Sequence, residues 1–137
     1  MYIQNIRDAG NPEEKLDNVL VVWCAKLPES KYSVIVGWYK DATVYRNVNL
    51  LPYDKDTDRG LSEFGYWHNV VADKENCVLL PIEERKKDKW RAYRKRQNPN
   101  NFGFGQSNMW YAREESAQEY VSDIIKQIEE YNGDNLV

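Results

Sequence analysis

The segment from Arg85 to Arg96 combines positive charge with aromatic rings. It holds eight basic residues and one acidic residue, and Trp90 and Tyr93 lie between them. Basic side chains neutralise phosphates, and aromatic rings stack on bases. The whole chain has a net charge of −3, so this positive charge is a local concentration. The pattern indicates contact with nucleic acid; a solvated face that balances an acidic protein is the alternative.

Two further strings join large rings to turn-forming or amide side chains. In GWYKDATVYR (37–46), Trp38 and Tyr39 are neighbours in a predicted strand, and strand neighbours point to opposite faces of a sheet. One of these rings must therefore leave the core. In FGFGQSNMWY (102–111), glycines let the backbone approach a ligand, and Gln and Asn side chains match the edge of a base. An ordinary glycine turn before a helix is the alternative for the second string.

The composition excludes most common catalytic and cofactor sites. His68 is the only histidine, and Cys24 and Cys77 lie in apolar segments without the spacing of metal ligands. Neither of the common glycine-rich loops that bind nucleotide phosphates occurs. We therefore expect no metal and no cofactor. Free thiols of this kind are typical of a reducing compartment, so we expect a cytoplasmic protein.

The length and the hydropathy predict one small domain away from the membrane. A chain of 137 residues has room for one core. No apolar run approaches the ~18 residues that cross a bilayer. We expect a single domain over residues 1–132, with residues 133–137 as the start of a linker or tail.

Apolar and β-branched runs predict five strands, and helical spacing predicts one long helix. The turn at Leu27–Ser30 favours an antiparallel hairpin, and a second turn is expected at Lys40–Ala42. We expect a polar loop at 51–60, and at 82–97 a helix or a loop with one helical turn. The predicted strands are Asn18–Ala25, Tyr32–Tyr39, Thr43–Val48, Gly65–Ala72 and Asn76–Leu80, and the helix spans the apolar positions from Ala117 to Tyr131.

These elements predict an α+β fold. The expected sheet is curved, mostly antiparallel and five- to six-stranded, and it could curl into an open barrel. Helices flank it, and the last of them is the C-terminal amphipathic helix.

Four strings carry a resemblance to a known family. VLVVWCA, VIVGWYKDATVYRN, CVLLPIEER and FGFGQSNMWYA follow one another between about Val19 and Tyr111. They resemble the EVE and YTH-like modules of the PUA superfamily, which occur in modification-dependent restriction proteins such as relatives of the McrBC system and HNH nucleases. The resemblance implies a PUA-like open barrel and a pocket for a modified base flipped out of nucleic acid. It also implies a recognition domain without catalysis, with an effector nuclease or NTPase fused to it or in a partner.

The resemblance also implies roles for particular residues. Aromatic walls stack on the flipped base, amide side chains meet its polar edge, and basic residues hold the flanking phosphates. The implied base-binding residues are Trp38, Tyr39, Tyr45, Gln106, Ser107, Asn108 and Trp110. The implied phosphate-binding residues are Lys40, Arg46, Arg91, Arg94, Lys95 and Arg96.

We therefore expect a non-catalytic reader of methylated or hydroxymethylated DNA in a restriction or defence protein. Three alternatives remain open. A reader of a methylated base in RNA needs the same stacking rings. A small metal-dependent nuclease would use Glu84 and Lys86, which form a Glu-x-Lys pair. A protein-interaction module would use the surplus of Trp and Tyr as a binding hot spot.

Overall fold

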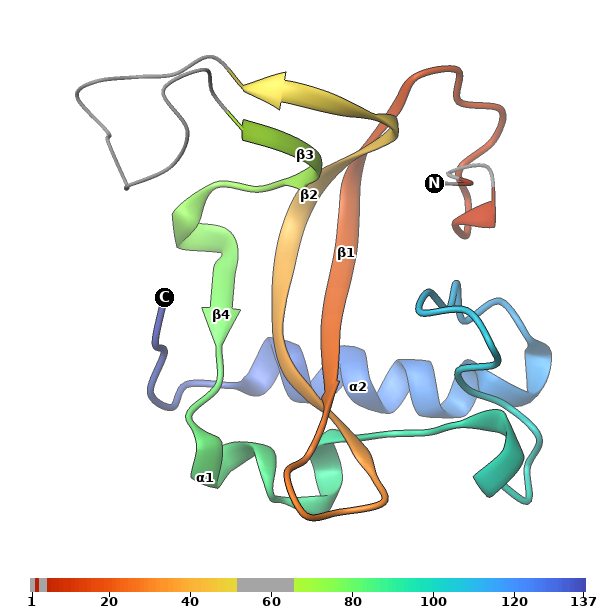
Figure 1. Cartoon of the computed structure of the whole chain (residues 1–137), viewed down its shortest axis with the longest axis vertical. Helices are drawn as coiled ribbons and strands as arrows, with labels where there is room; N and C mark the ends of the chain where they lie inside the picture. The colour runs from red at the N-terminus through yellow and green to blue at the C-terminus, as the bar shows by residue number, and fades with distance from the viewer. Residues whose placement is uncertain (1, 3–4, 52–65) are drawn as a thin grey trace.

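The computed structural model describes Tyr2, residues 5–51 and residues 66–137, with the backbone alone at 48–51 and 66–67. It has the predicted α+β fold, with a five-stranded antiparallel sheet and a C-terminal helix (Figure 1). No helix in these described ranges is long and apolar enough to cross a membrane. The strands are β1 (Lys15–Lys26), β2 (Ser33–Leu51), β3 (Tyr66–Val71), β4 (Cys77–Leu79) and β5 (Arg91–Ala92), and the helices are α1 (Ile82–Arg85) and α2 (Gln118–Glu130).

β2 is the strand to which all the other described strands pair. One of its edges pairs with β1, and its other edge pairs in turn with β5, β4 and β3. Trp38 of β2, for example, lies opposite Val22 of β1 and Val78 of β4. The sheet does not close among the described strands, because β1 pairs with β2 alone. β1 therefore keeps one free edge.

Residues 40–42 do not form the predicted turn. β2 runs through them to Leu51, so the expected separate strand at Thr43–Val48 is the second half of β2. The register against β1 shifts at this point, and Asp41 takes a positive φ of 49°, a conformation that Asp tolerates. The prediction of a turn was wrong because a β-bulge and a tight turn favour the same residue types.

The other predicted elements occur close to their expected positions. Residues 82–97 begin with the short helix α1, in agreement with the expected helical turn, but they also contain two 3-10 turns and the strand β5, which was not predicted. α2 follows the predicted apolar spacing and ends at Glu130. The predicted loop at 51–60 lies, apart from Leu51, outside the described residues. In the predicted tail, the Asn135 side chain accepts from the Leu79 N–H at 2.9 Å, so the tail lies along β4.

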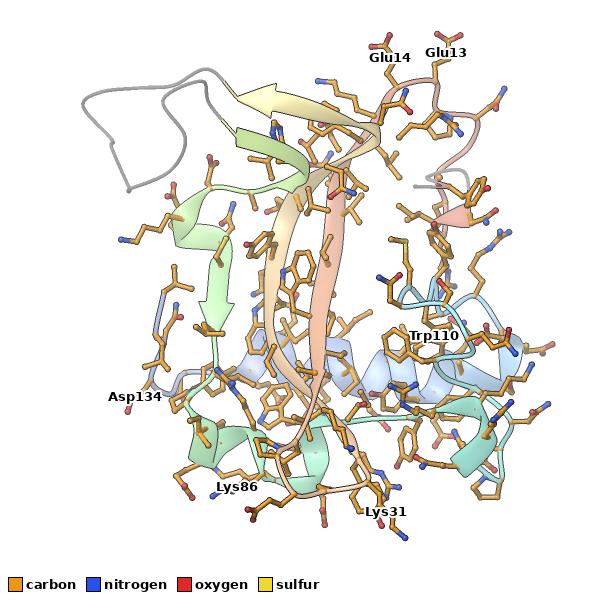
Figure 2. The ribbon with its side chains drawn as sticks, viewed as in Figure 1. Glu13, Glu14, Lys31, Lys86, Trp110 and Asp134 are labelled. Carbon is orange, nitrogen blue, oxygen red and sulfur yellow. The ribbon has the colours of Figure 1, made fainter. Side chains whose placement is uncertain are left out.

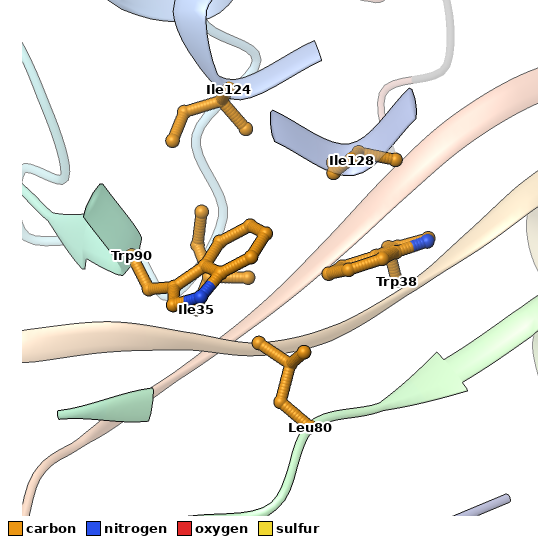
Figure 3. Packing of buried hydrophobic residues seen from close by; sticks show 6 residues of the cluster. All are labelled: Ile35, Trp38, Leu80, Trp90, Ile124 and Ile128. Atoms are coloured by element: carbon orange, nitrogen blue, oxygen red, sulfur yellow. The ribbon is translucent and has the colours of Figure 1, made fainter. Parts of the chain in front are cut away.

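Six buried side chains form the core between the sheet and α2 (Figure 3). The rings of Trp38 and Trp90 stack with centroids 5.4 Å apart, and Tyr131 packs edge-on against both. Burial of such rings removes much apolar surface from water, at about 25 cal/mol per Å². The six core residues are Ile35, Trp38, Leu80, Trp90, Ile124 and Ile128.

Gly37 lies where β2 and β4 approach each other, and a Cβ there would collide with the Val78 carbonyl oxygen. Because that oxygen belongs to the backbone, β4 would have to shift. We expect Gly37→Ala to lower the free energy of unfolding by about 2 kcal/mol, measured by urea unfolding with Trp fluorescence. Gly105→Ala is the matched control, since a Cβ there meets nothing within 4 Å. Equal stabilities for the two variants would contradict this close approach.

Candidate functional site

Five aromatic side chains pack against one another beside the N-terminal end of α2. The Trp110 ring stacks on Phe102 and on Tyr120, with centroids 6.1 Å apart in both pairs. Phe104 lies 5.8 Å from Trp110, and Tyr93 contacts both Phe102 and Tyr120. Figure 2 places Trp110 on the irregular segment that lies to the right of β1. We call these five rings the aromatic cluster.

Backbone pairing between two irregular segments brings the aromatic cluster together. The Phe104 N–H donates to the Tyr93 carbonyl at 2.9 Å, and the Lys95 N–H donates to the Phe104 carbonyl at 3.0 Å. Gly103 has a φ of 124°, and a Cβ there would collide with the Tyr93 carbonyl oxygen. Only glycine adopts this conformation without strain. The Phe-Gly-Phe string therefore lets its two rings flank a close backbone contact.

A cavity of about 580 Å³ lies between the aromatic cluster and β1. Its size is typical of small-ligand sites, roughly 300–1,000 Å³. β1 contributes apolar side chains such as Val22 and Cys24, and the aromatic cluster contributes Phe104, Trp110 and Tyr120. A second hollow of about 260 Å³ runs along β1 and shares Val22, Phe104 and Trp110 with the first. The two hollows together follow the free edge of β1.

The N-terminal segment closes one end of the larger cavity. Residues 6–8 belong to its lining. Arg7 Nη1 donates to Gln118 Oε1 at 2.6 Å, and Gln118 Nε2 donates to the Ala112 carbonyl at 3.1 Å. These bonds tie the N-terminal segment to the chain that follows Trp110, so one hydrogen-bonded unit shapes that end of the cavity.

The inner wall of the cavity is uncharged at neutral pH. Burial raises the pKa of Cys24 to about 12, so the residue remains a thiol. Burial is also the main cause that raises the pKa of Tyr120, whose hydroxyl donates to the Arg91 carbonyl at 2.6 Å. The charged groups in the lining, Arg7, Asp8 and Asp17, belong to the N-terminal part of the chain. A flat, uncharged group therefore fits the inner wall.

Residues 94–96 (Arg-Lys-Arg) follow Tyr93 directly and are exposed. Their side chains form no ion pair with any residue in the described ranges. The lysines at 86, 87 and 89, by contrast, pair with Glu83 and Glu84. Arg91 stacks its guanidinium on the Tyr32 ring at 3.9 Å. Within the segment 85–96, residues 94–96 are therefore cations without an ion pair in the described ranges, and they follow a ring of the aromatic cluster directly.

Three rings that were predicted for the pocket lie elsewhere. Trp38 is 1% exposed in the core, so a base cannot reach it in this fold. Tyr39 points to the opposite face of the sheet, where its ring meets Trp23 edge-on at 5.3 Å. Tyr45 packs edge-on against His68 at 5.5 Å. None of the three predicted rings lines either hollow.

The two predicted phosphate-binding residues of β2 also lie apart from the cavity. Lys40 is half-buried and lines neither hollow. The Arg46 guanidinium donates to the carbonyls of Pro12 and Glu13 at 2.9 Å and 2.8 Å. Arg46 therefore holds the segment that precedes β1.

The predicted residues that the structure does bring to the site come from the string 106–110. Trp110 lines both hollows, and Asn108 lines the smaller one. Gln106 and Ser107 are exposed on the same loop, where the Ser107 Oγ accepts from the Met109 N–H at 3.1 Å. Arg91 and residues 94–96 line neither hollow, but residues 94–96 follow Tyr93 of the aromatic cluster directly.

Several cavity residues were not predicted, among them Val22, Cys24, Phe104 and Tyr120. The string that contains Phe104 was interpreted through its glycines and amide side chains, so the sequence predicted no role for the Phe104 ring. The other three lie in the apolar pattern of a strand or a helix, which predicts core packing. A cavity wall and a core use the same residue types, so the sequence holds no signal that separates them.

Glu84, the carboxylate of the nuclease alternative, makes structural hydrogen bonds in this fold. It accepts from Lys87 Nζ at 2.6 Å and from Trp90 Nε1 at 3.0 Å. These hydrogen bonds, first from Lys87 and then from Trp90, lower the pKa of Glu84 to about 2. Lys86 pairs with Glu83 instead. Within the described ranges, no three His, Cys, Asp or Glu residues are grouped so that they could hold a metal ion.

Comparison with known proteins gives no match. No family model matches the chain, and no curated protein and no solved structure matches it. The cavity, its rings and the charge beside it are therefore the basis for a functional proposal.

We expect Glu84→Gln to destabilise the protein at neutral pH by about 2 kcal/mol, because a buried Trp90 N–H and a lysine lose their charged acceptor. The folded-state pKa of Glu84 lies near 2, below its ordinary value of 4.5. Its contribution to stability is therefore fully present above about pH 4.5 and is lost as the pH falls through about 2. Urea unfolding at a series of pH values measures both effects.

Glu83→Gln is the control for this experiment, because Glu83 is largely exposed and pairs with Lys86 on the surface. This variant should stay within about 0.5 kcal/mol of the parent. If Glu84→Gln kept the full acid-dependent loss of stability seen in the parent, the lowered pKa of Glu84 would be refuted.

Proposed function

We propose that this chain is a non-catalytic reader of modified DNA, which takes a flipped base into the cavity between β1 and the aromatic cluster. One observation carries the proposal. Stacking rings line a cavity of about 580 Å³, and the exposed basic residues 94–96 follow one of the cluster rings in the chain. A flat ligand attached to a charged backbone needs this combination.

The energetics support a flipped base as the occupant. Extrusion of a base from a duplex costs a few kcal/mol of stacking and pairing. Stacking on an aromatic side chain returns about 1–3 kcal/mol per base, and Phe104 and Trp110 both line the cavity. The apolar side chains of Val22 and Cys24 offer a surface for a methyl group, worth about 0.8 kcal/mol when buried.

The wider proposal is that the chain is an EVE/YTH-like module of the PUA superfamily, and that its sheet is a PUA-like open barrel. On this proposal the module serves a restriction or defence protein as its recognition domain, and cleavage belongs to a nuclease fused to it or associated with it. Single-stranded RNA with a methylated base is the second candidate ligand, because the same rings would stack on it without any duplex to open.

A matched panel of oligonucleotides tests the proposal. It contains plain, methyladenine, methylcytosine and hydroxymethylcytosine DNA duplexes, and methyladenine RNA, each at two salt concentrations. Preferential binding of one modified DNA supports the proposal. Preferential binding of the methyladenine RNA would instead support the second candidate ligand, a methylated base in RNA. Weak, equal and salt-sensitive binding to every member would contradict modified-base reading and leave only the basic segment.

Trp110→Leu should weaken binding of the preferred oligonucleotide by about tenfold or more, because the base loses a stacking surface. Tyr39→Leu should leave the affinity unchanged, since Tyr39 lines neither hollow. Fluorescence anisotropy gives the affinities, and thermal melting shows that each variant folds. The reverse pattern, with loss at Tyr39 and none at Trp110, would place the base on the other face of the sheet.

Arg94→Ala should weaken modified and plain DNA alike and reduce the slope of log affinity against log salt by about one. Lys86→Ala is the charge-matched control, because Lys86 pairs with Glu83 and follows α1 directly, and Figure 2 shows it at the lower left whereas Trp110 lies to the right of β1. A salt slope that Arg94→Ala leaves unchanged would remove residues 94–96 from the proposed phosphate contact.

A further inference from the structure

The free edge of β1 faces the cavity, and this edge consists of main-chain groups. In an antiparallel pair, residues alternate between those whose N–H and C=O point to the partner strand and those whose N–H and C=O point away. Every second residue of β1 therefore directs a donor and an acceptor to the side that β2 does not cover. The hydrogen bonds around β4 identify which residue of β1 does so beside the aromatic cluster.

β4 sets the alternation. The Leu79 N–H donates to Asn135 Oδ1 at 2.9 Å, and the Cys77 carbonyl accepts from Asn135 Nδ2 at 3.0 Å. Both groups therefore point away from β2. By alternation, the residue between them, Val78, directs its N–H and C=O to β2, where it lies opposite Trp38.

The same alternation then passes across β2 to β1. Because Trp38 uses its main-chain groups toward β4, its neighbours Gly37 and Tyr39 use theirs toward β1. Their partners on β1 are Trp23 and Val21. Val22, between these two, must therefore direct its N–H and C=O to the free edge.

Val22 thus presents an unused donor and acceptor beside the rings. Its main-chain groups have no hydrogen-bond partner among the described residues outside the sheet. Val22 lines both hollows, as do Phe104 and Trp110. A polar backbone group in a half-buried, apolar wall has a strong requirement for a partner.

We propose that the main-chain N–H and C=O of Val22 read the hydrogen-bonding edge of the base that stacks on the aromatic cluster. The inference rests on the proposed function and names the atoms that orient the ligand. Nucleobases carry a donor and an acceptor side by side on their pairing edge, which a single strand residue complements. The amide side chains of Gln106 and Asn108 are then not required for this contact. The backbone of the sheet then makes this contact, and the pairing of Val21 and Trp23 with β2 holds Val22 in place.

Val22→Pro tests the inference, because proline removes the N–H and is tolerated on an edge strand where that N–H faces solvent. Val22→Ala is the matched control, since it shortens the same side chain and keeps the N–H. We expect Val22→Pro to weaken binding of the preferred modified duplex of the panel by about tenfold, and Val22→Ala to bind more tightly than Val22→Pro. Equal binding by two folded variants would overturn the inference.

Amide NMR on the parent protein gives a second readout that does not depend on the folding of Val22→Pro. On addition of the preferred duplex, the Val22 amide should shift and exchange more slowly, while the amides of Val21 and Trp23, already bonded to β2, should change little. If the duplex binds and the Val22 amide does not respond, the inference is wrong and the proposed function stands. If no modified oligonucleotide of the panel binds preferentially, the proposed function fails, and this inference fails with it.

Discussion

The arrangement of the sheet depends on β2, because among the described strands it is the one with partners on both edges. β1 covers one edge, and β3, β4 and β5 share the other. A slip of one residue would turn the core side chains of β2 to the other face. Trp38 opposes such a slip, because its ring stacks on Trp90 and packs edge-on against Tyr131. Its indole N–H has no hydrogen bond among the described residues, so packing holds the ring. This core fixes β1, and the edge that β1 leaves uncovered forms one wall of the cavity.

The molecule divides its large rings between two tasks. Trp38 and Trp90 are buried against α2 and contribute their apolar surface to stability. Phe104 and Trp110 remain partly accessible beside the cavity. A ligand can bury apolar surface that the fold leaves exposed. The free energy that burial of these rings would have added to folding can then contribute to binding instead. Phe104 and Trp110 lie on the irregular chain around Gly103, and Tyr120 of α2 joins them in this wall of the cavity.

The sequence predicted the elements better than the site, and particular residues explain the difference. The first hairpin and α2 followed from apolar periodicity, which the core imposes on the chain. The alternation rule correctly separated Trp38 from Tyr39, but it could not decide which ring faces α2. Asp41 misled the prediction because its positive φ serves a bulge and not a turn. Trp110 was among the predicted pocket residues, and it lines the cavity. The opposite wall of the cavity, the free edge of β1, was not predicted, because which edge stays free depends on long-range strand pairing that no local sequence pattern encodes.

On the proposed function, the backbone and the side chains of the cavity would contact different parts of a base, and this limits which modified bases the cavity could distinguish. On the proposed function, the main-chain groups of Val22 would meet the same pairing edge in plain cytosine and in a cytosine modified away from that edge, so they would orient the base without sensing the modification. On this proposal, discrimination between plain and modified cytosine would come from side chains that touch the added group. An apolar wall such as Cys24 favours a buried methyl group by only about 0.8 kcal/mol. A hydroxymethyl group needs a hydrogen-bond partner as well, and the charged groups in the lining, Arg7, Asp8 and Asp17, belong to the N-terminal part of the chain. The two modifications would therefore require different contacts in one cavity, so on the proposed function the polarity of the side chains that face the added group would decide which modified base is preferred.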